Sequence, residues 1–459
     1  MKVIFEKEGF FDCSEYFKQQ KGTVKIFENG KVELQILNKI NPKAPRFKFS
    51  NKKIEIISGI LENGKKIFLQ ESFYIGSGGV IFSGYSRINF ICNKCYVYNN
   101  FKYNEIINFT SIIFEIDNLE EWINQPNADV TFSSDNNNII INYQRPKQIK
   151  YDINNEFDII FLYSYECTAP HHKLNQLKQI ISIKISTKEE QPLNFFIKNI
   201  YKLVTFFSIC QNALISFRNM KGYNRNIVKE NSYPINNISV DIFYQNYFDK
   251  KTDYLYYKSL VAFSTIQKDF SKIFTLWCEK FDELSPVVTF YNNGKFFFKN
   301  DHESRFLMYA IGLEVLHNRT TETTSLNKKK YQNKLQNLLE ESNIEEKYKK
   351  KIRDCAMGGY QLSFAERLKC LCHSFEFVQN EDKMIKNIRD IRNHLVHRNE
   401  SNDKLIYNNF EEILNLTNKM DYLLILNILS IVEVDYNKIN AQIKYSIENF
   451  FKQPSLKLK

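Results

Sequence analysis

Two hydrophobic periodicities divide the chain. Up to residue 185, apolar and polar residues alternate in short runs, which is typical of half-buried β-strands. The segments TVKIFENGKVELQIL and IEIISGILENGKKIFLQ each place an Asn-Gly pair between two such runs, and Asn-Gly supplies the positive φ angles of a tight hairpin turn. Further strands are predicted at INFICNKCYVYNN, SIIFEI, ADVTFSS, NIIINYQ, FDIIFLYSY and IISIKIS. We therefore expect an antiparallel β-rich domain, a sandwich or barrel, over residues 1–185.

The pattern changes after Ser186. Thr187 and Glu190 have the spacing of a helix capping box, and Pro192 fits the first turn that would follow. Apolar residues then recur at helical spacing. Farther along, ISVDIFYQ is a strand candidate and Thr265 to Leu284 a helix candidate. Residues 186–298 are interpreted as a mixed connecting region.

Beyond Asn300 the periodicity is helical throughout. Asn300 with Glu303, and Ser363 with Glu366, have the spacing of helix N-cap pairs. Helices are predicted at 302–318, 329–341, 343–357, 363–376, 380–397 and 408–433, with one more after Asn437. Long helices with short connections predict an all-α bundle over residues 299–459. The fold class expected for the whole chain is therefore α+β and multidomain.

Composition and charge add little to this division. The chain of 459 residues is 43% apolar and 25% charged, as suits a globular protein of several domains. Sixty-three Lys and Arg against 52 Asp and Glu give a net charge of +11, which favours polyanions such as nucleic acid. A lysine-rich solvated surface explains the same number. The densest basic runs, Lys328-Lys329-Lys330 and Lys349-Lys350-Lys351, lie on predicted helices.

The expected compartment is the cytoplasm. Charged Glu6, Lys7 and Glu8 stand where a secretory signal needs an apolar core. The nine cysteines are an odd, scattered set, which suits a reducing environment. The apolar stretch from Tyr422 to Val432 is too short to cross a bilayer, which takes about 20 residues. No membrane association is expected.

Several small motifs suggest chemistry that their surroundings do not support. Cys92 and Cys95 have the spacing of half a zinc site, but they flank a predicted hairpin turn, and the CLCH run at 370–373 lies in a different predicted domain. The glycines of the GSGG run at 76–79 lack the following helix and Gly-Lys-Ser/Thr of a phosphate loop, so a turn is expected there. His171-His172 reads as loop surface. No metal or cofactor is predicted.

One carboxylate on the predicted helix 302–318 is expected to need a positively charged partner. Leu307, Ile311, Glu314 and Asn318 are spaced along one stripe, which places Glu314 among apolar residues. A buried carboxylate is costly unless it is paired. We expect an arginine from another helix beside Glu314, either as a structural ion pair or as part of a site.

The stretch IRDIRNHLVHRNE, 388–400, gathers Arg389, Arg392, Asn393, His394 and His397 near the end of an amphipathic helix. Arginine can stabilise charge on a phosphate, histidine can move the proton of a 2′-hydroxyl or of a leaving oxygen, and asparagine can orient either group. On a regular helix, however, Arg392 and His397 are about 140° apart. They meet only if the helix loosens or the arginine reaches round. Zinc binding by the two histidines, or a merely polar helix end, are the other interpretations.

The run Arg392-Asn393-His394-Leu395-Val396-His397 resembles the Arg-x4-His motif of HEPN domains. By that match Arg392, Asn393 and His397 take the catalytic positions, while His394 and Arg389 fall outside the core motif. The order YAIGLEVLH, LSFAERLKCL, motif helix and long apolar helix resembles the HEPN domain of ApeA-type anti-phage proteins. FEKEGFFD and GKVELQI are similar to the N-terminal domain of the same family.

This resemblance implies an abortive-infection protein that is a metal-independent endoribonuclease, leaving 2′,3′-cyclic phosphate and 5′-hydroxyl ends on its RNA substrate. It also implies a homodimer or higher homo-oligomer, in which Arg392 of one protomer faces His397 of another, a pocket role for Glu314 in holding Arg392, and an N-terminal domain that senses a phage-derived trigger. Two alternatives stay open: a non-catalytic HEPN module that binds RNA or a protein, and a zinc-dependent hydrolase using His394 and His397.

Overall fold

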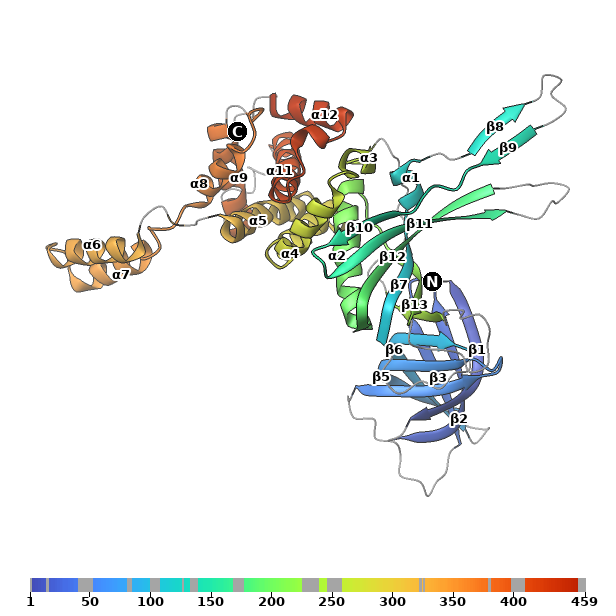
Figure 1. Cartoon of the computed structure of the whole chain (residues 1–459). Helices are drawn as coiled ribbons and strands as arrows, with labels where there is room; N and C mark the ends of the chain where they lie inside the picture. Colours follow the sequence, from blue (N-terminus) through green and yellow to red (C-terminus); the bar gives the residue numbers. More distant parts are fainter. Residues whose placement is uncertain are drawn as a thin grey trace. The chain divides into compact units, whose positions relative to one another are not determined.

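The computed structural model describes residues 2–13, 16–39, 53–80, 85–99, 108–125, 128–132, 139–167, 177–224, 239–245, 258–321, 324, 327–378, 381–397 and 409–452. The chain forms two compact units, Met1–Lys272 and Ile273–Lys459. Strands dominate the first unit and helices the second (Figure 1), which confirms the expected fold class. The boundary falls inside helix α4 (Phe270–Asn292), within the region 186–298 that the sequence predicts as connecting.

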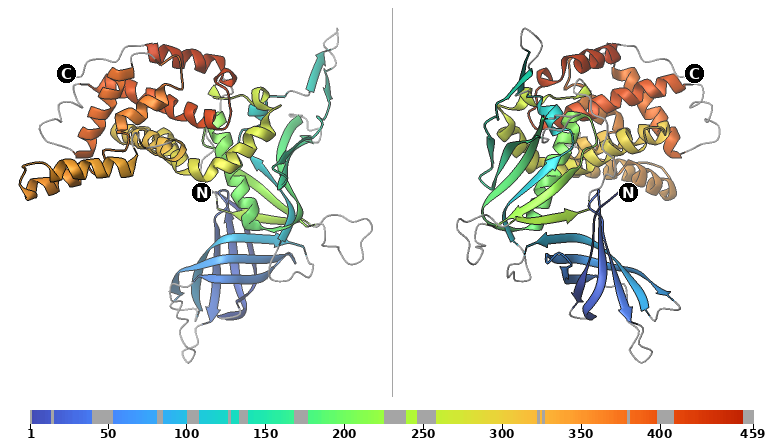
Figure 2. Two further views of the ribbon diagram at one scale, coloured as in Figure 1. Left: turned by 60° about the vertical axis from the view of Figure 1, so that its left-hand side comes forward. Right: turned by 90° about the vertical axis from the view of Figure 1, so that its right-hand side faces the viewer.

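A closed barrel of six antiparallel strands begins the first unit (Figures 1 and 2). Its strands are β1 (Val3–Cys13), β2 (Phe17–Phe27), β3 (Val32–Lys39), β4 (Ile54–Leu61), β5 (Lys66–Val80) and β6 (Tyr85–Tyr98). The order β6-β3-β2-β1-β4-β5 closes because β5 also pairs with β6. The two predicted hairpins are confirmed: Gly30 and Gly64 have φ angles of 81° and 79° in the turns between β2 and β3 and between β4 and β5.

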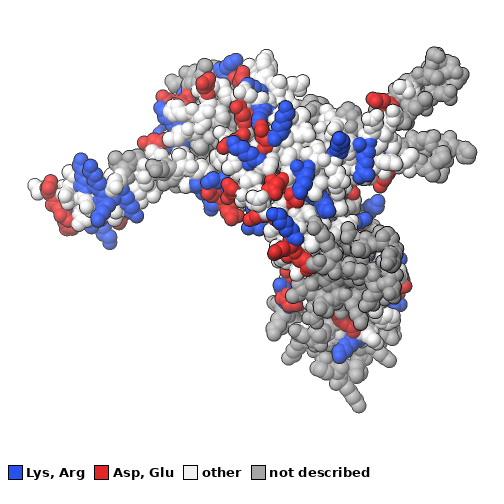
Figure 3. Space-filling view, viewed as in Figure 1, with Lys and Arg blue, Asp and Glu red and all other residues white. Residues whose placement is uncertain are grey.

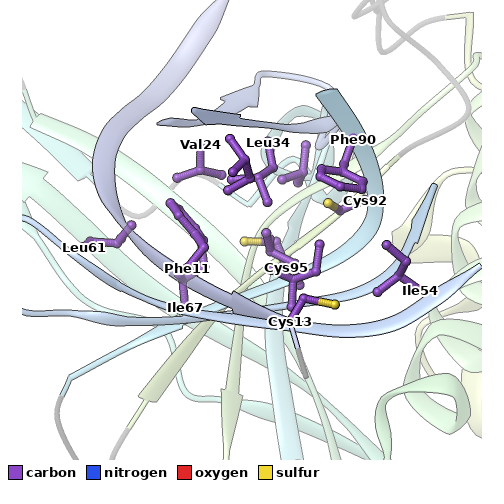
Figure 4. Packing of buried hydrophobic residues seen from close by; sticks show 14 of the residues in the cluster. Phe11, Cys13, Val24, Leu34, Ile54, Leu61, Ile67, Phe90, Cys92 and Cys95 are labelled. Carbon is purple, nitrogen blue, oxygen red and sulfur yellow. The ribbon is translucent and has the colours of Figure 1, made fainter. Parts of the chain in front are cut away.

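Apolar side chains fill the barrel interior. Figure 4 shows inward-pointing residues from several strands, among them Phe11, Val24, Leu34, Ile67 and Phe90, all at most 1% exposed. Because alternate side chains of a strand point to opposite faces, the alternation in the sequence places these residues on the inside. The interior is therefore a packed core.

The barrel continues into an open sheet through its strand β6. One edge of β6 pairs with β5, and its other edge pairs first with β3 and then with β14. The open part runs in the order β14 (Ser239–Tyr244), β13 (Phe217–Tyr223), β7 (Asn108–Ile116), β12 (Leu177–Pro192), β11 (Phe157–Cys167) and β10 (Ile149–Ile153). The predicted strand ISVDIFYQ is thus confirmed as β14, and it joins the same sheet as the N-terminal strands.

Smaller elements complete the first unit. They are the strand pair β8 (Ala128–Phe132) and β9 (Ile139–Tyr143), and the helices α1 (Leu119–Ile123), α2 (Leu193–Gln211) and α3 (Phe263–Ile266). Helix α2 packs on β7 and β12. Trp122 of α1 is fully buried against Phe207 and Phe263, and its Nε1 donates to the carbonyl oxygen of Val261 at 2.8 Å.

Two local predictions in this unit are wrong. Thr187 and Glu190 do not cap a helix, because β12 continues to Pro192 and Oγ1 of Thr187 donates to the carbonyl oxygen of Thr110 on the neighbouring strand. The 76–79 glycine run is not a turn, since Gly76 and Gly78 pair with β6 inside β5. The helix expected from Thr265 to Leu284 is present with other bounds, because α4 begins at Phe270, after the short α3, and continues to Asn292.

The second unit is a helical bundle. After α4 and the π-helical turn η2 (Asn293–Phe297) come α5 (His302–Thr320), α6 (Lys328–Glu340), α7 (Glu346–Ala356), α8 (Phe364–Cys372), α9 (Glu381–His397), α11 (Phe410–Ile431), the 3-10 turn η4 (Tyr436–Lys438) and α12 (Ala441–Lys452). All seven helices predicted beyond Asn300 are present, with α8 ending four residues early. Asp301 and not Asn300 caps α5, because its side chain accepts from the backbone N–H of Ser304.

Helix α11 lies at the centre of this bundle. It packs against α5, α8, α9 and α12 and is buried on most of its circumference. Helices α5, α8 and α9 surround it, so their polar faces are brought close to one another. Among the described residues, no helix is long and apolar enough to cross a membrane.

Candidate active site

Glu314 lies at the margin of the buried face of α5. That face consists of Phe306, Tyr309, Ala310, Gly312, Leu313, Leu316 and His317. The Glu314 side chain is 28% exposed and Asn318 is exposed, so the prediction that Glu314 stands inside the apolar stripe is wrong. The true stripe is rotated toward α11, and Glu314 can reach charged side chains of neighbouring helices.

Two arginines from two other helices face the Glu314 carboxylate. Nη2 of Arg392, on α9, donates to Oε2 of Glu314 at 3.1 Å, and Nη1 of Arg367, on α8, lies 3.7 Å from Oε1. The expectation that an arginine from another helix pairs with Glu314, and that this arginine is Arg392, is confirmed. The carboxylate therefore ties α5, α8 and α9 together.

Arg367 is a residue of this cluster that the sequence did not single out. It is only 8% exposed, its Nε donates to the carbonyl oxygen of Leu362 at 2.9 Å, and its Nη1 donates to Oδ1 of Asn318. The available signal was its place one residue after Glu366, in the confirmed capping box that Ser363 and Glu366 form at the start of α8. The cap fixes the first turn of α8 and so directs Arg367 toward α5.

The guanidinium of Arg392 is held from several sides. Its Cζ lies 5.3 Å from the ring centre of Phe364, and its Nη1 donates to Oδ1 of Asn393 at 3.4 Å. A cation over an aromatic face is attracted by the ring quadrupole. The side chain is nevertheless 28% exposed. Arg392 is thus fixed in position but open to solvent.

His397 lies apart from Arg392. Helix α9 is regular through His397, its last residue, so the loosening that would bring the two together does not occur. Five residues along a helix correspond to a rotation of about 140° and a rise of about 7.5 Å. Among the described residues, no hydrogen bond or ion pair joins Arg392 to His397. Within one chain the two motif side chains therefore serve different surfaces.

The remaining predicted site residues of α9 divide between its two faces. Arg389 and Asn393 are exposed, as is His397, and all three follow one face of the helix. Arg389 does not join the Glu314 cluster, because its guanidinium donates to Oδ1 of its neighbour Asp390 at 2.8 Å. His394 is only 7% exposed and belongs to the face that packs into the bundle.

A zinc site at His394 and His397 would need ligands from outside this pair. One histidine is buried and the other exposed. Over the ranges that the structure describes, no three His, Cys, Asp or Glu side chains come close enough together to hold a metal ion.

The other motifs with metal-ligand residues are built into other contacts. Cys92 and Cys95 lie inside strand β6 and are fully buried, so the hairpin turn predicted between them is wrong. Burial raises the pKa of the Cys92 thiol to about 12. His373 pairs with Glu381, with 3.1 Å between Nε2 and Oε1. His171-His172 lies outside the described residues.

His317 is a buried histidine one turn beyond Glu314. It is 0% exposed, and neither ring nitrogen has a hydrogen-bond partner among the described residues. Burial, and secondarily the positive charge of Arg367, lower its pKa. The ring therefore remains neutral behind the arginine cluster.

These features define a class of protein: a β-barrel with an attached open sheet, followed by a helical bundle whose motif helix presents Arg392 beside the carboxylate of Glu314. The family model for ApeA N-terminal domain 1 matches residues 7–277, and the model for the Apea-like HEPN domain matches residues 307–438. The chain therefore belongs to the ApeA family of anti-phage proteins, with a C-terminal domain of the HEPN nuclease type. No curated protein and no solved structure gave a significant match.

Proposed function

We propose that this protein is a metal-independent endoribonuclease whose catalytic Arg392 and His397 come from two copies of the chain. One observation carries the proposal: Arg392 is fixed by Glu314 and Phe364 yet open to solvent, while His397 is exposed on another side of the same regular helix. Each copy of the chain thus presents Arg392 on one surface and His397 on another.

The proposed reaction is transfer within the RNA backbone. The 2′-hydroxyl oxygen forms a bond to the adjacent phosphorus, and the bond from phosphorus to the 5′-oxygen of the next nucleotide breaks. The 2′-hydroxyl gives up its proton and the 5′-oxygen receives one, which leaves a 2′,3′-cyclic phosphate and a 5′-hydroxyl. His397 moves the proton at one of these oxygens, and Arg392 stabilises the negative charge that builds up on the phosphoryl oxygens.

Two-fold symmetry makes the pair complete. If two α9 helices face each other in antiparallel directions, Arg392 of one protomer comes opposite His397 of the other, and the reverse pair forms at the second site. The dimer interface would then include both the exposed face with Arg389, Asn393 and His397 and the side of α9 that carries Arg392. In this arrangement Asn393, which already accepts from Arg392, orients the guanidinium toward the scissile phosphate.

The direct test is cleavage of total cellular RNA in the presence of EDTA. We expect the wild type to release 2′,3′-cyclic phosphate ends, and Arg392→Ala and His397→Ala each to abolish them. Loss of cleavage on addition of EDTA would contradict metal independence. Binding of RNA without new ends, by the wild type as well as by both variants, would instead identify the non-catalytic HEPN module.

A mixing experiment tests whether the site is shared between protomers. In a dimer of one Arg392→Ala chain and one His397→Ala chain, one of the two sites contains both intact residues. Because half of randomly mixed dimers are of this kind, the mixture should regain about a quarter of the wild-type rate while each variant alone stays inactive. An inactive mixture that size-exclusion chromatography shows to contain exchanged dimers would overturn the shared site.

In the cell we infer that this activity defends against phage by abortive infection. RNA cleavage in the cytoplasm would stop phage production together with host growth, and the N-terminal unit would release it in response to a phage-derived trigger. The support is membership of the ApeA family and the joining of a separate β-rich unit to the HEPN bundle. Protection in a plaque assay should therefore be lost with Arg392→Ala, at unchanged protein level.

A further inference from the structure

Helices α6 and α7 form a hairpin of unusual surface composition. We define the basic hairpin as residues 327–357. The two helices pack on each other, and the hydroxyl of Tyr331 donates to the carbonyl oxygen of Ala356 at 2.9 Å. None of the residues of α7 is buried, and Leu339 is the one buried residue of α6. Such a hairpin buries little apolar surface and so adds little to the stability of the bundle. We therefore considered whether its surface binds a ligand.

Positively and negatively charged residues occupy different parts of the basic hairpin. The two helical arms carry nine Lys and Arg, namely Lys328, Lys329, Lys330, Lys334, Lys347, Lys349, Lys350, Lys351 and Arg353. Four of its five acidic residues, Glu340, Glu341, Glu345 and Glu346, are at or beside the tip between the helices. Figure 3 shows blue side chains gathered over the middle of this hairpin and red ones toward its end. A general enrichment in lysine does not explain this separation of the two signs.

The arms also present solvent-exposed side chains that suit a nucleic acid. An ion pair joins Lys349 to Glu346, whereas Lys329, Lys330, Lys350 and Lys351 form none with any residue that the structure describes. Tyr348 lies between Lys347 and Lys349 in the sequence and is 54% exposed. Cations that can contact phosphates, with an aromatic ring on which a base can stack, are the two elements of a single-strand binding surface.

Short connections join the basic hairpin to the two helices that flank the candidate active site. Helix α5 ends six residues after Glu314, about 9 Å along the helix axis, and α8 begins three residues before Arg367, about 4.5 Å away. Between them Thr324 pairs with Gln361 in an antiparallel bridge, which closes the base of the hairpin. The hairpin thus emerges from the two helices that hold Arg392 in place.

We propose that the basic hairpin is an RNA-binding arm that holds a single-stranded part of the substrate beside the site of cleavage. This inference rests on the proposed function for the identity of the polyanion, but the surface itself is independent of Arg392. The arm would supply binding energy shared by substrate and transition state. Its loss should therefore raise KM and leave kcat nearly unchanged.

The experiment compares two variants of equal charge, both in an Arg392→Ala background so that the probe survives. The arm variant combines Lys329→Gln, Lys330→Gln, Lys350→Gln and Lys351→Gln. The matched control combines Lys18→Gln, Lys147→Gln, Lys188→Gln and Lys268→Gln, four exposed lysines of the first unit. Glutamine has nearly the helix propensity of lysine, so the hairpin should remain helical by circular dichroism.

The measurement is the affinity for a fluorescently labelled single-stranded RNA of mixed sequence over a range of salt concentrations. Each lost phosphate contact lowers the slope of log K against log salt by about 0.7, so the arm variant should lose about 3 units of slope. It should bind at least about tenfold more weakly at low salt, whereas the control changes little. Equal salt slopes for the arm variant and the control would overturn the proposal. The exposed side chains of Leu338 and Ile352 would then point to a surface that binds another protein.

Failure of this inference is distinguishable from failure of the proposed function. If the wild type cleaves RNA but the two variants bind RNA equally well, the proposed RNA-binding arm is contradicted and the proposed nuclease activity is not. If the wild type releases no ends but the arm variant still loses its salt dependence, the surface binds RNA in a protein that is not a nuclease. With Arg392 intact, a raised KM at constant kcat in the arm variant supports both.

Discussion

Oε2 of Glu314 lies 3.1 Å from Nη2 of Arg392, while Oε1 of the same carboxylate faces Nη1 of Arg367 at 3.7 Å. One negative charge thus meets two positive ones, and the cluster keeps a surplus of positive charge. Arg367 is buried and anchored to backbone, so the surplus can be offered to solvent only through Arg392. This geometry suits an arginine that must stay in place and still attract a phosphate.

Neutralising Glu314 should harm activity more than stability. Glu314→Gln keeps the shape but removes the charge that orients Arg392. Since both side chains are 28% exposed, solvent screens the ion pair and its loss should cost less than about 1 kcal/mol of stability. We expect kcat for RNA cleavage to fall roughly tenfold to a hundredfold, as for a lost positioning contact. Glu279→Gln, on the exposed side of α4, is the matched control; an equal loss there, or none in Glu314→Gln, would contradict the role of Glu314.

Arg367→Lys tests the buried anchor of the cluster. Lysine keeps the charge but cannot reproduce the fork that reaches Leu362, Asn318 and Glu314 together. We expect the second unit to lose about 1–3 kcal/mol of stability. Trp277 is the one tryptophan of that unit, so urea unfolding followed by fluorescence in a Trp122→Phe background reports on it. An unchanged midpoint would show that the contacts of Arg367 carry no net stability.

Two glycines with nearly equal φ angles predict different costs for the same substitution. At Gly64 an added Cβ meets nothing within 4 Å, so Gly64→Ala should cost only the strain of the left-handed conformation, about 1–2 kcal/mol. At Gly30 the added Cβ would collide with the backbone carbonyl oxygen of Tyr244, at the end of β14. Gly30→Ala should therefore destabilise the first unit distinctly more. Urea unfolding monitored by Trp122 in a Trp277→Phe background compares them, and equal midpoints would contradict the close approach of β14 to this turn.

Burial of His317 predicts a loss of stability in acid. The pKa of its imidazole is lowered in the folded protein by burial and by Arg367, below the ordinary value of 6.5 that the unfolded chain keeps. Below about pH 6.5 the unfolded state then binds more protons than the folded state, so stability falls as the pH falls. Above that pH both states are neutral at this residue and the effect vanishes.

His317→Phe should reduce this pH dependence, because phenylalanine cannot bind a proton and suits a site where neither ring nitrogen is bonded. The free energy of unfolding is measured between about pH 5 and pH 8. Identical acid profiles for wild type and His317→Phe would show that His317 is not the group that titrates.

The sequence by itself determined most of the elements. Asn-Gly pairs specify hairpins because few other residues adopt positive φ, and apolar periodicity specifies helices from His302 onward because one face of each must be buried. It also predicted an arginine beside Glu314, although the apolar stripe from which this was argued lies on a different face of α5 in the structure. The motif at 392–397 and the family followed from the chain alone.

Only the tertiary structure decided which groups form hydrogen bonds and ion pairs with one another. Thr187 has the spacing of a helix cap, yet a neighbouring strand supplies the carbonyl oxygen that it bonds, and no local pattern contains that strand. The packing of α5, α8 and α9 around α11 selected Arg367 as the second arginine at Glu314 and left Arg389 with Asp390. Contacts between residues far apart in the sequence depend on the packing of whole helices, which the spacing within any one helix does not fix.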